Sequence, residues 1–145
     1  MLDQVETMFD GMEAMLKKLK KKSYEENMKV FREKNGHFFD EMRDHVSAAE
    51  DRQGAAEEVA DVFVGQVRGH FLEKGKIRSR KQADLNFFMI YYVFPAILLM
   101  EGEEADVLAG AICKKWGETF KDSKIGYTTY EKIYDGFNEK VFGLF

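Results

Sequence analysis

The feature that most constrains the fold is an uninterrupted apolar run from Phe87 to Met100. As a helix, this run would span about 21 Å at 1.5 Å per residue, well short of the roughly 30 Å hydrocarbon layer of a bilayer. We therefore expect a helix that is buried inside a domain and no membrane span. Pro95 lies within the run and should kink this helix, because proline lacks a backbone N–H and crowds the carbonyl four residues earlier.

Helical periodicity extends over most of the remaining sequence. Apolar residues recur at intervals of three and four, and the chain contains one proline in 145 residues, so a sheet has little support. We expect an all-α fold, in which about six helices of a single domain over residues 1–145 pack around the central apolar helix at about residues 80–100. The expected helices cover about residues 2–22, 24–49, 55–71, 80–100, 103–120 and 130–144.

Three capping boxes predict where helices begin. In a capping box, a Ser or Thr and a Glu or Gln three residues later satisfy amides that the first helical turn leaves without partners. Gly36 lies inside the second expected helix and could kink or interrupt it. The three boxes are Ser23 with Glu26, Ser79 with Gln82, and Thr128 with Glu131.

Composition argues against several classes of protein. With 26 acidic and 22 basic residues, the net charge of −4 argues against a surface that coats nucleic acid, although a local basic patch remains compatible with it. The single Cys113 cannot form an intramolecular disulfide and is expected to pack as a small hydrophobe. No secretory leader opens the sequence, so we expect a cytoplasmic protein. Because no G-x-S-x-G, H-E-x-x-H, P-loop or Rossmann motif is present, we expect neither catalysis nor a cofactor.

The clearest candidate for a binding site is a basic cluster that runs into the start of the apolar helix. Cations in a first turn oppose the helix dipole, unless an anion sits among them and uses both their charge and the free amides. A solvated loop is the alternative, because no glycine-rich phosphate motif accompanies the cations. The cluster consists of Lys74, Lys76, Arg78, Arg80 and Lys81.

A second basic cluster ends the first expected helix. Lysines near a helix C-terminus are favourable for capping alone, so this cluster does not by itself indicate a binding site. If the fold brought the two clusters side by side, they could bind nucleic acid with a strong salt dependence, but the sequence does not place them together. The second cluster consists of Lys17, Lys18, Lys20, Lys21 and Lys22.

The first helix also carries a narrow apolar face at heptad spacing. Such a face could be an interaction seam for a protein partner or a homodimer, and it could equally pack on the core of its own domain. The seam consists of Leu2, Val5, Phe9, Met12, Leu16 and Leu19.

A small-molecule pocket is the first alternative to partner binding. His70 falls in an apolar stripe, where a buried imidazole needs a hydrogen-bond partner such as Tyr91 or Tyr92. With Trp116, these residues would line an aromatic pocket between the third, fourth and fifth expected helices. A satisfied histidine within the core is the simpler interpretation.

A metal-dependent enzyme is the second alternative. His37, Glu41 and His45 recur every four residues, a spacing at which helical side chains can share one cation. His37 lies almost opposite the apolar face of its helix, however, so these three side chains are better explained as solvated residues.

These patterns favour binding over catalysis. We expect a small helical interaction or regulatory module that binds a protein or an anionic partner. Its contact surface would combine the seam of the first helix with the basic cluster at residues 74–81.

Overall fold

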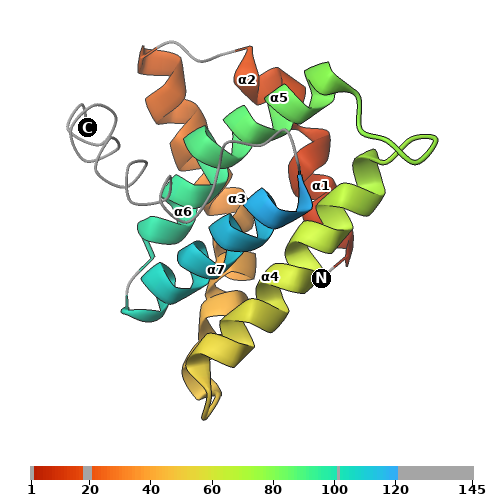
Figure 1. Cartoon of the computed structure of the whole chain (residues 1–145). Coiled ribbons are helices and arrows are strands. Elements are labelled where there is room, and N and C mark those ends of the chain that lie inside the picture. The colour runs from red at the N-terminus through yellow and green to blue at the C-terminus, as the bar shows by residue number, and fades with distance from the viewer. Residues whose placement is uncertain (1, 18–20, 101, 121–145) are drawn as a thin grey trace.

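The computed structural model describes residues 2–17, 21–100 and 102–120, and within them the backbone is almost entirely helical (Figure 1). The described part of the chain contains no strand beyond one isolated bridge between Glu73 and Lys76, so the predicted all-α fold is confirmed. The last expected helix and its capping box, Thr128 with Glu131, lie outside the described residues. The helices are α1 (Leu2–Asp10), α2 (Met12–Leu16), α3 (Lys21–Ala48), α4 (Arg52–Phe71), α5 (Ser79–Phe88), the π-helical turn η1 (Met89–Val93), α6 (Phe94–Leu98) and α7 (Glu104–Thr119).

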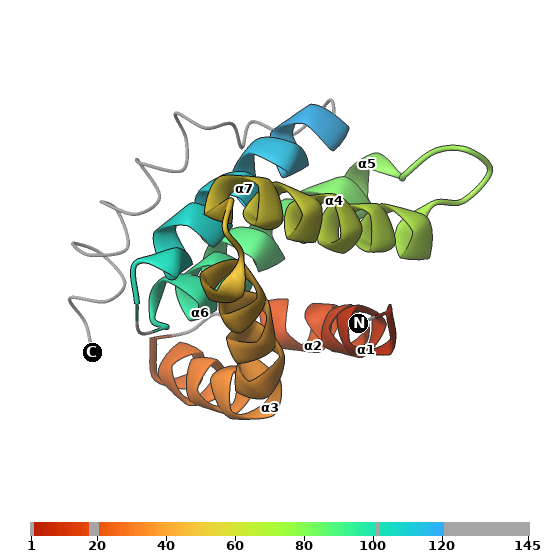
Figure 2. The same cartoon turned by 90° about the horizontal axis from the view of Figure 1, so that it is seen from below.

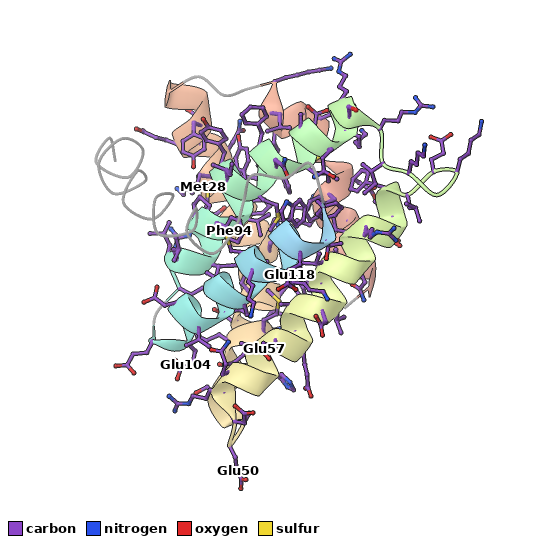
Figure 3. The ribbon with its side chains drawn as sticks, in the orientation of Figure 1. Met28, Glu50, Glu57, Phe94, Glu104 and Glu118 are labelled. Carbon is purple, nitrogen blue, oxygen red and sulfur yellow. The ribbon has the colours of Figure 1, made fainter. Side chains whose placement is uncertain are left out.

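The helices form two layers around a shared core. Figure 2 shows α4 and α7 on one side and α1, α2 and α3 on the other. The most extensive contact between two helices joins α4 to α7. At one end of the domain Glu104 links three helices, because its carboxylate accepts a hydrogen bond from Ser47 on α3 at 3.3 Å and pairs with Arg52 on α4 at 3.5 Å (Figure 3).

Aromatic side chains fill the space between the layers. The ring of Phe9 on α1 lies 4.9 Å from that of Phe88 on α5 and 6.1 Å from that of Phe63 on α4, both in edge-to-face geometry. Phe88 in turn lies 5.6 Å from Phe31 on α3. Such pairs contribute roughly 0.5–1.5 kcal/mol each beyond the area that they bury, so this cluster ties α1, α3, α4 and α5 together.

The predicted buried faces of α3, α4 and α7 are largely confirmed. All predicted positions of the last described stripe are buried: Leu108, Ala109, Ile112 and Trp116 on α7, and Phe120 directly after it. Gly36 does not interrupt α3, which runs unbroken through 28 residues. One hydrophobic position of the predicted stripe on α4 is exposed: Val62 is 44% exposed, because it lies at the edge of the buried face.

The apolar run is one continuous segment of three helical pieces, α5, η1 and α6. Pro95 lies in the first turn of α6, and the π-helical turn directly precedes it, which is where the missing N–H and the bulk of the ring must be accommodated. In a regular α-helix the amide of residue 95 would donate to the Tyr91 carbonyl. Here the Tyr24 hydroxyl on α3 donates to that carbonyl at 2.5 Å.

The central position expected for this segment is not confirmed. Phe87 is 50% exposed and Leu99 is 38% exposed, so the segment presents part of its surface to solvent. Within the described part of the chain, no helix is both long and apolar enough to cross a membrane.

The start of the chain departs from the predicted single helix. A turn at Gly11 separates α1 from α2, because glycine is the weakest helix former after proline. Ser23 lies inside α3, which begins at Lys21, so it cannot cap this helix. Ser79 is likewise the first residue of α5, and Arg78 takes the extended backbone of the cap position without a side-chain cap. Both predicted capping boxes are therefore wrong.

Candidate anion-binding site

A surface depression of about 520 Å³ lies where the end of α2 meets the start of α5, two helices that are neighbours in the structure (Figure 1). Three of the five predicted basic residues, Arg78, Arg80 and Lys81, line it. Lys17, from the second basic cluster, lines it from the α2 side. The fold therefore brings members of both clusters to one place, which the sequence did not indicate. Its complete lining is Glu13, Leu16, Lys17, Arg78, Arg80, Lys81 and Asp84.

Lys81 is the most constrained cation of the depression. Its ammonium forms an ion pair with Glu13 on α2 at 2.5 Å and lies 5.5 Å from the centre of the Phe71 ring. The hydrogen bond and charge of Lys81 hold the pKa of Glu13 below its usual value, and the charges of Lys17 and Arg80 lower this pKa further. The Glu13 carboxylate thus lies within the field of three cations.

The remaining cations differ in how they are held. Arg78 pairs with Glu73 at 3.4 Å across the loop that connects α4 to α5. Among the described side chains, Arg80 and Lys17 have no ion-pair partner within 4.0 Å. Cations that are not held in a direct ion pair are available to an incoming anion.

Lys74 and Lys76 lie on the loop outside the depression. The backbone hydrogen bonds between Glu73 and Lys76, each 3.0 Å long, close the loop into a tight turn. Lys74 and Gly75 occupy the turn with positive φ angles of 52° and 77°. Both lysines are exposed and neither lines the depression. Lys18 and Lys20 lie outside the described residues, and the side chains of Lys21 and Lys22 are not described.

The start of α5, which carries Arg80 and Lys81, has no side-chain cap. Because no side chain caps the start of α5, the first-turn amides lack a capping acceptor. With four cationic and two acidic side chains, the lining carries a net positive charge in a protein of net charge −4. The arrangement suits the recognition of an anion.

The interaction seam of the first helix lies mainly in the domain's own core. Val5, Phe9 and Met12 are buried, and Leu16 is partly buried against the same core. Side-chain burial at Leu2 is not described, and Leu19 lies outside the described residues. The three buried residues therefore pack on the core of their own domain, which was the alternative to partner binding for this face, and they are not accessible to a partner in this structure.

Trp116 and Tyr92 of the expected aromatic pocket have hydrogen-bond partners on neighbouring helices. Trp116 and Tyr92 are buried in the core, where the Trp116 indole donates to Asn86 at 2.8 Å and the Tyr92 hydroxyl donates to the Met15 carbonyl at 3.1 Å. Tyr91 lies at the surface edge, where its ring stacks on Phe87. These two hydrogen bonds therefore join α7 to α5 and η1 to α2.

His70 pairs with carboxylates on α1 in place of the tyrosines that we expected. Its Nε2 lies 3.0 Å from Asp10 Oδ1, and its Nδ1 lies 3.9 Å from Glu6 Oε1. The side chain is 27% exposed. The cause is that the His70 end of α4 packs against α1, so the imidazole faces acids at the surface.

The histidines of the expected metal site remain at the surface. His37 Nε2 lies 3.0 Å from Glu41 Oε1, but the His37 side chain is 87% exposed. His45 lines a shallow depression of about 290 Å³ together with Glu41. Over residues 2–17, 21–100 and 102–120, no group of three or more histidine, cysteine or acidic side chains is placed to hold a metal ion.

A second depression, of about 470 Å³, lies between α4 and α7. Glu57 on α4 and Glu118 on α7 are among the residues that line it (Figure 3). Lys115 on α7 pairs with Asp61 on α4 at 3.1 Å. With four acidic and two basic side chains, the lining of this depression is net negative, so the net positive depression at α2 and α5 is the better suited of the two to an anion.

The sequence did not indicate the two acids of the site, Glu13 and Asp84. Glu13 and Lys81 are 68 residues apart, and no local pattern links them.

Comparisons of this chain with protein-family models, with curated proteins and with solved structures found no match.

Proposed function

We propose that this domain is a binding module that holds an anionic partner in the depression between α2 and α5. The observation that carries the proposal is the convergence of Lys17 with Arg78, Arg80 and Lys81, from two distant segments, around one concave surface. Clustered cations in a concave site raise the local concentration of anions and accelerate their association. The module acts by recognition, since the lining supplies charge and hydrogen-bond donors.

The test is the affinity for phenyl phosphate, measured by isothermal titration calorimetry. The variant Arg78→Ala/Arg80→Ala removes two cations from the depression. Because an exposed ion pair contributes roughly 0.2–1 kcal/mol, we expect the double variant to bind about two- to thirtyfold more weakly.

The matched control is Lys74→Ala/Lys76→Ala, which removes the same charge from the adjacent loop outside the depression. We expect this control to retain affinity close to that of the wild type. Equal loss in both double variants would show that only the general field matters, and unchanged binding in both would show that the anion binds elsewhere. Either result would refute the proposal.

A further inference from the structure

The depression already contains an anion of its own. Glu13 reaches from α2 to the Lys81 ammonium at 2.5 Å, although its side chain is 60% exposed and other orientations are open to it. Lys17 and Arg80 line the same depression. An external anion that uses Lys81 must therefore compete with the Glu13 carboxylate.

Anions differ in how much they gain when they replace Glu13 at Lys81. A carboxylate ligand carries the same charge as Glu13, so replacing Glu13 at Lys81 yields little net interaction. A phosphodiester also carries a single charge. A phosphate monoester carries about −1.5 to −2 at neutral pH and has three acceptor oxygens, so it can contact Lys81 and the cations without ion-pair partners at the same time.

We infer that the depression selects phosphate monoesters over carboxylates and phosphodiesters, and that Glu13 is an internal competitor that lowers the affinity for every anion. The inference rests on the proposed function, since it concerns the same site. Displacing Glu13 from Lys81 costs each anion the same interaction, so the second charge and third acceptor oxygen of the monoester decide which anion binds well. Asp84 on the α5 side also lowers the affinity for anions, because its carboxylate lines the depression as well.

The experiment compares three probes on the full chain at pH 7.5 and constant ionic strength: phenyl phosphate, diphenyl phosphate and benzoate. We expect the wild type to bind phenyl phosphate at least about tenfold more tightly than either singly charged probe. Phenyl phosphate binding should weaken between pH 7.5 and 5.5, because the second pKa of a phosphate monoester is about 6.

The variant Glu13→Gln removes the competitor while keeping the size of the side chain. We expect all three probes to bind about two- to fivefold more tightly, with a gain for phenyl phosphate at least as large as that for benzoate and diphenyl phosphate, because none of them then competes with a carboxylate for Lys81. The matched control is Glu33→Gln, which makes the same change in net charge at an exposed position on α3 outside the depression. Its affinities for the three probes should equal those of the wild type.

The outcomes separate this inference from the proposed function. Equal binding of the three probes by the wild type, or unchanged affinities in Glu13→Gln, would overturn the inference while anion binding at the site stood. If no probe bound to either protein, the proposed function would fail as well. Thermal unfolding of each variant shows whether it is folded, and the exposed position of Glu13 predicts a melting temperature near that of the wild type.

Two further probes distinguish the sources of a monoester. A phosphoserine tetrapeptide is compared with free O-phosphoserine in the same titration. Tighter binding of the peptide would support the proposal with a modified protein side chain as ligand. Equal affinities would support it with the phosphate group as the whole determinant, and failure of both to bind where phenyl phosphate binds would contradict it.

Discussion

Replacing Tyr24 by phenylalanine tests how the fold accommodates Pro95. The Tyr24 hydroxyl donates to the Tyr91 carbonyl, which in a regular helix would accept from the amide that proline lacks. The aromatic ring itself packs between those of Tyr91 and Tyr92, at 6.4 and 5.5 Å between centroids. The substitution Tyr24→Phe removes the hydroxyl and keeps this packing.

The expected cost follows from the loss of one partly buried hydrogen bond. A typical intramolecular hydrogen bond contributes about 0.5–1.5 kcal/mol, and we expect the free energy of unfolding to fall by this amount in Tyr24→Phe. For a domain of this size the melting temperature should fall by roughly 2–6 °C. Urea unfolding followed by circular dichroism, with linear extrapolation, measures the free energy directly.

A double-mutant cycle isolates the role of proline. In the background Pro95→Ala, residue 95 has an amide that can donate to the Tyr91 carbonyl, so Tyr24→Phe should cost less there than in the wild type. A loss below about 0.3 kcal/mol in the single variant, or the same loss in both backgrounds, would refute this explanation of the π-helical turn.

Two further predictions concern the core. Burial raises the pKa of both Tyr24 and Tyr92 above the usual value of 10.0, so their contribution to stability is complete below pH 10. As the pH rises above 10, the tyrosines of the unfolded chain lose their protons before those of the folded chain, so the free energy of unfolding measured with urea should fall. The fall should be less steep in Tyr24→Phe. A free energy of unfolding that does not change with pH would contradict the burial argument. Asn86→Leu removes the oxygen that accepts from Trp116 and Gln82, and it should lower the free energy of unfolding by about 1–3 kcal/mol, with a smaller loss in Asn86→Asp. Equal losses in the two variants would show that the acceptor oxygen is not what matters.

The sequence predicted the helices that have regular apolar stripes. The buried faces of α3 and α7 follow from a spacing of three and four residues, which depends only on local helix geometry. The capping boxes at Ser23 and Ser79 were wrong, because a motif of two residues does not fix the first turn against the packing of the whole helix. The break at Gly11 was missed because the apolar spacing continues across it.

The site was only half predictable from the sequence. The basic residues at the start of α5 are visible as a cluster, but their meeting with Lys17 depends on the packing of α2 against α5. The partners of His70 were missed for the same reason, since Asp10 lies 60 residues away in the chain. Contacts between distant segments are set by the tertiary fold, which periodicity does not encode.

Mapping the bound anion by NMR tests the central claim most directly. Phenyl phosphate is added to the ¹⁵N-labelled chain at constant ionic strength, and the amide shifts of all residues are followed. We predict saturable shifts concentrated at residues 13–17 and 78–84, which flank the depression. Shifts concentrated elsewhere, such as along α4 and α7, or no saturable shifts at all, would contradict the assignment of the depression as the anion site.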